Sequence, residues 1–129
     1  MSIQSDIRTY LLTQTGVTDL VGSRIYAMKS PKRATFPSLT YSTVSSVRTR
    51  SHSGDSSLTT KRIQLSCWAA KYGDCRDLVD QLVSSLESYK GLMGLTTVYS
   101  SFVENEIDAY DPESKLYHVP VDVKIRYNG

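Results

Sequence analysis

The sequence has few of the residues that metal sites, redox sites and disulfide frameworks need. Its 129 residues include only two cysteines and two histidines. Cys67 and Cys75 have a spacing that matches no zinc or redox motif. Cytosolic thiols are normally kept reduced, and a free cysteine on an apolar face behaves as a small hydrophobic side chain. We therefore expect two buried free thiols and no disulfide.

Long hydrophobic runs are also missing. No apolar stretch approaches the length needed to cross a bilayer, and the polar start at residues 1–5 has no signal-peptide pattern. The composition, 40% hydrophobic and 22% charged, is ordinary for a soluble domain, and 129 residues suffice for one core but not for two. We expect one domain over residues 1–129 that is made in a cytoplasm and contacts no membrane.

The motifs of common enzyme classes are absent as well. His52 lies in a polar segment without periodicity, and His118 lies on the polar face of an expected strand. No serine stands in a nucleophile-elbow context, and no glycine-rich phosphate loop precedes a helix. The chain is therefore not expected to be an enzyme or to bind a cofactor.

A group of acidic residues in the second half has the right chemistry for a hard cation but not the right pattern. It lacks the spacing and the glycine of a calcium loop. Its members are Glu104, Glu106, Asp108, Asp111 and Glu113. We expect a solvated or partner-facing acidic loop, and no metal site.

The clearest positive signal is a strand followed by a helix between Lys61 and Gly91. Apolar residues alternate with Gln64, Ser66 and Trp68, which predicts a strand with one buried face. The inward positions of this strand are Ile63, Leu65, Cys67 and Ala69.

Apolar residues then recur at three- and four-residue steps from Cys75 to Leu86, which predicts an amphipathic helix. Gly73 or Asp74 is expected to be its N-cap, and Gly91 its C-terminal glycine. Because this helix and the preceding strand each carry one apolar face, they should pack together.

Other segments complete the sheet. The expected elements are a helix that ends before Gly16, a helical turn over 17–21, and strands over 24–28, 38–47, 95–103 and 117–127. Pro120 cannot donate a ladder hydrogen bond, so its part of the last strand should lie at an edge or a bulge. The sum predicts an α+β fold: a small, mostly antiparallel sheet with helices packed on one face and a long protruding β-hairpin loop.

The segment over 48–60 breaks every period. It contains one aliphatic side chain and many hydroxyls, so burial cannot repay the entropy of ordering it. The basic residues in and beside it are Arg48, Arg50, His52, Lys61 and Arg62. We expect a mobile hairpin tip that contacts a neighbour, a partner or the lumen of an assembly.

Charge is distributed unevenly along the chain. Residues 1–62 hold nine Lys and Arg against three Asp, a formal charge of +6, whereas residues 63–129 carry −4. One interpretation is chance and solvated faces; another is that a positive patch on one copy meets a negative patch on the next, as in a head-to-tail ring. The candidate interface residues are Lys32, Arg33, Glu104, Glu106, Asp108, Tyr110, Asp111 and Glu113.

Nucleic acid is a further candidate partner for the basic loops. They lack interleaved aromatic residues, and no expected helix carries clustered Arg or Lys, which argues against sequence-specific binding. Contact with the DNA backbone alone remains open.

The order of these signals resembles the tail-completion or tail-terminator proteins of long-tailed bacteriophages. The similarity covers nearly the whole chain. It is carried by Val21-Gly22-Ser23-Arg24-Ile25-Tyr26, by Phe36-Pro37-Ser38-Leu39-Thr40-Tyr41, by the strand over 62–69 that leads to Tyr72, and by Tyr110-Asp111-Pro112-Glu113 and Leu116-Tyr117-His118 before the last strand.

The resemblance implies a structural, non-enzymatic virion protein of the neck. In that family a six-fold ring caps the tail tube, ends its polymerisation and presents a surface to the head connector or head completion protein, with DNA passing through the ring. No catalytic or ligand-binding residue follows from it. A small DNA-binding or regulatory protein that uses the basic first half is the alternative.

Overall fold

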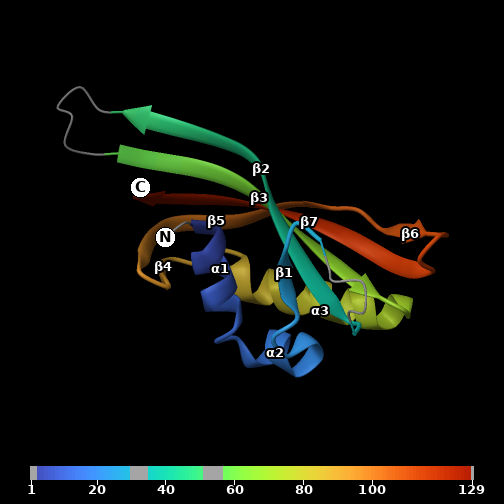
Figure 1. Ribbon diagram of the computed structural model, residues 1–129. Helices are drawn as coiled ribbons and strands as arrows, with labels where there is room; N and C mark the ends of the chain where they lie inside the picture. The colour runs from blue at the N-terminus through green and yellow to red at the C-terminus, as the bar shows by residue number, and fades with distance from the viewer. Residues whose placement is uncertain (1–2, 30–34, 51–56, 129) are drawn as a thin grey trace.

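The computed structural model describes residues 3–29, 35–50 and 57–128. Three helices and seven strands occur in these ranges (Figure 1). The helices are α1 (Ile3–Leu11), α2 (Thr15–Val21) and α3 (Tyr72–Leu86). The strands are β1 (Ile25–Ala27), β2 (Ser38–Arg50), β3 (Ser57–Ala69), β4 (Gly91–Met93), β5 (Thr96–Glu106), β6 (Ala109–Asp111) and β7 (Leu116–Asn128). This is an α+β chain, as expected.

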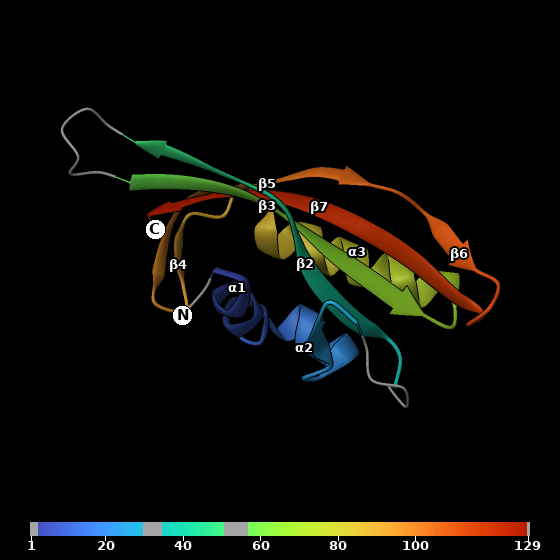
Figure 2. The ribbon, with the colours of Figure 1, turned by 45° about the horizontal axis from the view of Figure 1, so that its top comes forward.

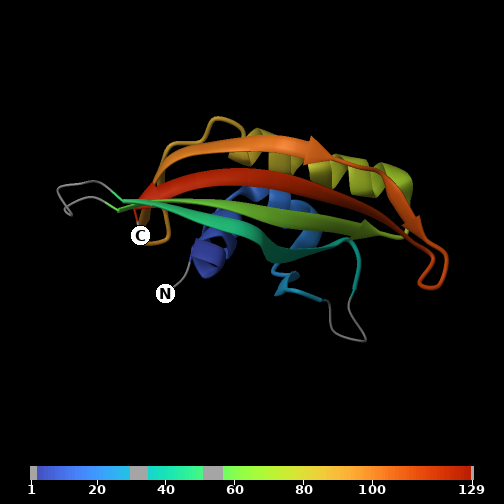
Figure 3. The same cartoon turned by 90° about the horizontal axis from the view of Figure 1, so that it is seen from above.

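All seven strands belong to one sheet with the order β1-β2-β3-β7-β5-β4, and β6 also pairs with β7 (Figure 2). The pairs are antiparallel except β1 with β2, which is parallel. The last strand in the sequence therefore lies at the centre of the sheet, between β3 on one side and β5 and β6 on the other. Seen from above, the strands run side by side across the molecule with the helices behind them (Figure 3).

One face of the sheet packs on the helices and forms the core. The predicted inward residues of β3 all have zero exposed surface, and so do Leu78, Leu82 and Leu86 of α3. Both predicted thiols are buried and free. Ile63 and Leu82 belong to the same buried cluster, so the strand and helix that the sequence predicted do share one core.

The ends of α3 differ from the prediction. The helix begins at Tyr72 after Lys71, which makes no side-chain capping bond, so Gly73 and Asp74 lie inside its first turn instead of capping it. At the other end, Ser88 takes the left-handed conformation with φ 58°, a role expected of Gly91. The reason is a tertiary contact. The Ser88 N–H donates to the Ser101 backbone carbonyl of β5 at 2.8 Å, which fixes the chain there.

The sequence predicted that Pro120 lies at a sheet edge or a bulge, but its strand, β7, lies at the centre of the sheet. Pro120 pairs with Ser66 inside β7, the central strand. Its carbonyl faces the other side, where it accepts the Ile107 N–H at 3.3 Å in the short gap between β5 and β6. Proline has no N–H, and at this position β7 has no regular strand partner that would need one.

The hairpin of β2 and β3 is more regular than the sequence suggested. Pairing continues to Arg50 and Ser57, with a bulge only between Thr43 and Ser45, where Val44 has no partner. β7 pairs with β3 as far as Leu58. Backbone hydrogen bonds to β7 therefore stabilise this hairpin, whose polar side chains contribute little through burial. The two strands extend beyond α1 and α3 in the side view (Figure 1).

A buried carboxylate joins α1 to the β4–β5 turn. Asp6 is 3% exposed and accepts a hydrogen bond from the Thr96 hydroxyl. The turn needs glycine at residue 94, because φ is +57° and an added Cβ would lie 2.6 Å from Asp6 Oδ1. In the described ranges no helix is both long and apolar enough to span a membrane.

Candidate assembly surfaces

The sheet face opposite the helices, here called the open face, carries the alternate side chains of β3 and β7. Near the middle of the two strands, Arg62 and Lys124 are register neighbours. Glu104 of β5 forms an ion pair with Arg62 and lies 3.9 Å from Lys124. A bulge between Val103 and Asn105 places Glu104 outside the regular pairing, and bulges commonly re-aim a side chain in this way.

The open face becomes less charged away from the hairpin. The Gln64 amide donates to Asp122 at 3.1 Å in the next cross-strand pair on this face. At the far end the Trp68 ring stacks on His118, with centroids 3.9 Å apart and planes 3° from parallel. The Trp68 N–H donates to the Thr40 hydroxyl at 3.0 Å. The face therefore runs from ionic to aromatic along the strands.

Burial lowers the pKa of His118, and the charge of Asp111 opposes that shift only in part. Its Nε2 is buried without a hydrogen-bond partner among the described residues. The neutral imidazole is therefore favoured, which suits a ring stacked on Trp68. Beside the stack lies a cavity of about 230 Å³, lined in part by Met28, Phe36 and Leu116.

The two long edges of the sheet differ. On the β5 edge, the Ser88 N–H donates to the Ser101 oxygen, and the Glu87 carboxylate accepts the Val103 N–H at 3.1 Å. On the β2 edge, β1 pairs only as far as Tyr41. Across the described residues, β2 has no further strand on that side, so its edge beyond residue 41 is open.

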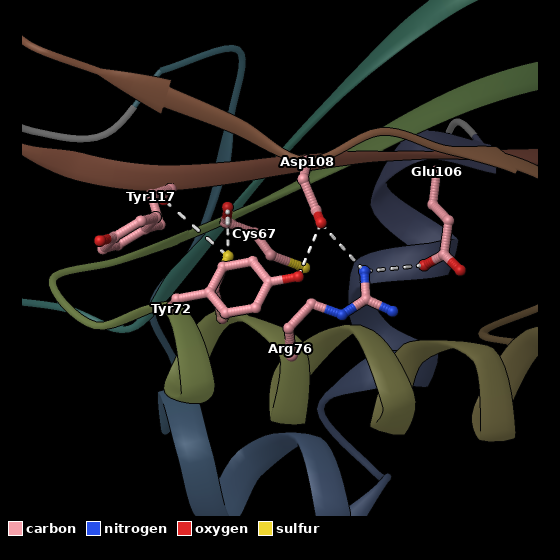
Figure 4. A network of polar contacts seen from close by, with 7 residues as sticks. Cys67, Tyr72, Arg76, Glu106, Asp108 and Tyr117 are labelled. Carbon is pink, nitrogen blue, oxygen red and sulfur yellow. Dashed lines mark hydrogen bonds and ion pairs between the residues drawn. The ribbon is translucent and has the colours of Figure 1, made fainter.

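A polar network ties the β5–β6 connection to the start of α3 (Figure 4). The Arg76 guanidinium lies 3.4 Å from Glu106 and 3.2 Å from Asp108. The Tyr72 hydroxyl donates to the other oxygen of Asp108 at 2.7 Å, and this hydrogen bond raises the pKa of Tyr72. One cation thus serves two carboxylates, which leaves one formal negative charge in the network.

The thiols lie beneath this network. The Cys75 thiol donates to the Cys67 carbonyl at 3.3 Å (Figure 4). Burial raises the pKa of Cys75 to about 11 and that of Cys67 well above its usual value. Both groups are therefore protonated at neutral pH and are poor nucleophiles.

The predicted site residues differ in where the structure places them. Arg62 and Glu104, expected to face partners, contact each other within the chain, and Glu106 and Asp108 share Arg76. Asp111 accepts the Glu113 N–H at 3.1 Å and closes the β6–β7 turn. Tyr110 and Glu113 are exposed, Lys61 is half-buried, and Arg48 and Arg50 occupy paired backbone positions near the end of β2. Lys32, Arg33 and His52 lie outside the described residues.

Sequence reasoning missed Arg76 and Lys124 as organising cations, and the stack of Trp68 on His118. Arg76 looked like one of many polar residues on the outer face of a helix. The stacked pair was not recognisable because its members are 50 positions apart and meet only through the β3–β7 register. In the described part of the chain no cluster of three or more His, Cys, Asp or Glu forms a metal site.

Comparisons with known proteins point to one family and one fold. The family model described as tail completion protein gp17 matches residues 5–128. A chain in the solved structure of the virion of a native gene transfer agent particle has a TM-score of 0.83 with this chain. That alignment covers 99% of this chain and 96% of the other at 9% sequence identity, so it shows a shared fold. A search of curated proteins found no match.

Proposed function

Because the chain belongs to the tail completion protein gp17 family, we propose that it completes a phage-like tail as a ring. Family membership supports a structural role in the virion. In the proposed role, a head-to-tail ring caps the end of the tail tube, stops its polymerisation and presents a surface to the head connector at the neck. The ring is expected to be a hexamer. The match of the family model to nearly the whole chain, hairpin and both sheet edges included, carries this proposal.

The sheet favours head-to-tail contact between copies. The strands β2, β3, β7 and β5 alternate in direction, so the two outer strands of this set are antiparallel to each other. When copies are related by rotation about an axis along the strands, the β2 edge of one copy therefore faces the β5 side of the next, where β4, Glu87 and Ser88 already occupy backbone groups of β5. The open β2 edge offers backbone groups for that contact. A two-fold dimer would instead use the same patch on both copies.

Backbone direction gives a specific test of the β2 edge. Tyr41 accepts the Met28 N–H from the β1 side, and the bulge at Val44 shifts the alternation by one residue, so Ser46 turns its N–H away from β3. Ser46→Pro removes that donor and leaves the β2–β3 ladder bonds in place. Ser46→Ala, which keeps the N–H, is the matched control.

We expect Ser46→Pro to be folded but to lose ring assembly, whereas Ser46→Ala assembles like the wild type. Mass and shape in solution, with and without tail tube protein, measure the outcome. A folded Ser46→Pro chain that assembles normally would reject the β2 edge as the contact.

The hairpin is proposed to act on a neighbour, on the tube or in the lumen. Its basic residues Arg48 and Arg50 suit contact with acidic protein surfaces or with the backbone of the passing genome, whereas Arg62 already pairs with Glu104. Replacing residues 51–56 with Asn-Gly, a favoured two-residue hairpin turn, should preserve the fold and abolish control of tail length or head joining. Infectious particles with normal tails would contradict this role. His52 lies in the replaced segment and is tested with it.

A DNA-binding regulator remains the alternative class. Arg62 on the open face already pairs with Glu104, which reduces the positive charge that this face offers to a DNA backbone. Tight binding of duplex DNA by the free chain, with a steep loss of affinity as salt rises, would favour it over the ring.

A further inference from the structure

A cavity on the open face brings cations and hydroxyl groups together near the middle of β3 and β7. Its volume is about 260 Å³, and residues from three adjacent strands line it: Ser45, Val47, Thr60, Arg62 and Lys124. Arg62 pairs with Lys124 on one side and with Ser45 of β2 on the other. Guanidinium, ammonium and hydroxyl groups all donate hydrogen bonds, so this cavity offers convergent donors to an anion.

Two bulges determine which polar groups surround the cavity. A regular β2 would continue its pairing with Val44 opposite Arg62, but the bulge places Ser45 there instead. A second bulge, in β5, lies beside the same row of the sheet and holds Glu104 against Arg62. Bulges are frequent next to functional sites, because they re-aim side chains. Both irregularities of the sheet therefore act on one place.

The charge around the cavity stays positive after internal pairing. Arg126 is the next residue of β7 after Lys124 on this face and extends the row of cations. Across the described residues Arg126 forms no ion pair. The three cations, with Arg62, outnumber Glu104 and give 3 − 1 = +2. Including Asp122, the next carboxylate along β7, still leaves +1.

The pair with Glu104 does not close the site. Glu104 contacts one terminal nitrogen of Arg62, whereas a guanidinium carries five N–H donors, so others stay available to a ligand. The side chains of Arg62 and Lys124 are 43% and 39% exposed, so a ligand reaches both from solvent. The Glu104 carboxylate is therefore an internal competitor for an anion at this site.

We propose that this cavity, here called the phosphate site, binds a phosphate group of a nucleic-acid backbone through Thr60, Arg62 and Lys124. Lys124 and Arg126 are two residues apart on one strand, about 7 Å along it. A small anion reaches only one of them, whereas a chain of phosphates presents a charge to each. No aromatic ring is among the described lining residues, so the contact is to the backbone and independent of base sequence.

The first experiment tests the chemistry of the site on the free chain. Inorganic phosphate is titrated while the Ser45 and Thr60 backbone resonances are followed by NMR, with sodium chloride at equal ionic strength as the control. We expect a saturable shift with phosphate only, about tenfold weaker binding in Lys124→Gln and tighter binding in Glu104→Gln. An equal response to sodium chloride, or unchanged binding in either variant, would overturn the site.

The hydroxyl group has its own test. Thr60→Val keeps the shape of the side chain and removes the donor, so phosphate binding should weaken about threefold. Lys71→Gln is the matched control for charge, because Lys71 precedes α3 and lies outside the cavity lining. Phosphate binding that is equally weak in Lys71→Gln and Lys124→Gln would reduce the effect to net charge and overturn the site. Circular dichroism and thermal melting confirm that each variant is folded.

The second experiment identifies the source of the phosphate. Fluorescence anisotropy measures binding of a labelled DNA duplex to the free chain over a range of salt concentrations. We expect weak binding, and a slope of log affinity against log salt that falls in magnitude by about 0.9 in each of Lys124→Gln and Arg126→Gln. Lys71→Gln should leave the slope unchanged. Polyglutamate of equal charge is the control for protein carboxylates.

The outcomes separate the phosphate site from the ring, because the site belongs to the single chain and goes beyond the proposed function. An unchanged slope in Lys124→Gln and Arg126→Gln overturns nucleic acid as the occupant. Polyglutamate that binds as tightly as DNA overturns it in favour of an acidic protein segment. Lys124→Gln should assemble like the wild type, and loss of its ring with DNA binding intact would assign Lys124 to a subunit contact and overturn the site. A wild-type chain that binds DNA as expected but forms no ring rejects only the proposed function.

Discussion

The two faces of the sheet are built on different physical principles. On the covered face, β3 contributes Ile63 and Leu65 with no exposed surface. On the open face, alternate residues of the same strand contact side chains of β5 and β7 through an ion pair, a hydrogen bond and ring stacking. One side is held by hydrophobic burial, and the other is organised by pairwise polar contacts that solvent screens. Stability should therefore depend on the covered face, and recognition of partners on the open face and the edges.

The largest expected effect lies on the covered face. Leu65→Ala removes a fully buried side chain, and such changes cost about 2–5 kcal/mol in the free energy of unfolding. The neighbouring Gln64→Ala on the open face loses one partly exposed hydrogen bond and should cost no more than about 1.5 kcal/mol. Urea unfolding of both variants measures the contrast. Equal losses would show that the two faces are not energetically distinct.

A smaller effect is expected where the open face is ionic. Glu104→Gln leaves Arg62 and Lys124 side by side without their counterion, which should cost up to about 1 kcal/mol at low salt because these side chains are partly exposed. The loss should shrink at high salt as the two cations are screened. Glu113→Gln is the matched control, since no ion pair involves Glu113 among the described residues. A loss that does not respond to salt would contradict the electrostatic origin.

The smallest effect concerns the aromatic end of the open face. The pKa of His118 is lowered by burial, so the unfolded chain binds its proton more readily than the folded one. This contribution to stability is complete above about pH 6.5, the ordinary value for histidine, and is lost as pH falls from there toward the folded pKa. Thermal melting between pH 7.5 and pH 5 should show a steeper decline for the wild type than for His118→Gln. Parallel curves would show that His118 does not contribute.

The helix α3 and strand β3 could be predicted because each repeats one pattern over many residues. Three- and four-residue spacing from Cys75 to Leu86 specifies a buried stripe, and alternation specifies a buried strand face. Caps were less predictable: Ser88, not Gly91, ends the helix region, because a hydrogen bond to β5 decides the backbone there. The prediction that Pro120 lies at an edge or a bulge failed for the same reason, because its neighbours across the sheet are not its neighbours in sequence.

The candidate sites were only partly accessible from the sequence. The acidic residues near β6 were recognised, but their internal partners Arg76 and Lys124 were not, because charge patterning along the chain does not show which opposite charges meet. The sequence also did not predict the pocket that Tyr72, Tyr110 and Tyr117 line. Tyr110 was singled out, yet Tyr72 and Tyr117 join it only when α3, β6 and β7 come together.

By itself the sequence determined which faces of its helices and strands are apolar, because side-chain spacing along a helix or strand is a local property of the backbone. Only the tertiary structure decided that the last strand is central, that one sheet edge is closed by Glu87 and Ser88 while the other is open, and that three distant tyrosines converge. Those features depend on strand order and register, which arise from long-range pairing between segments whose local patterns do not name their partners.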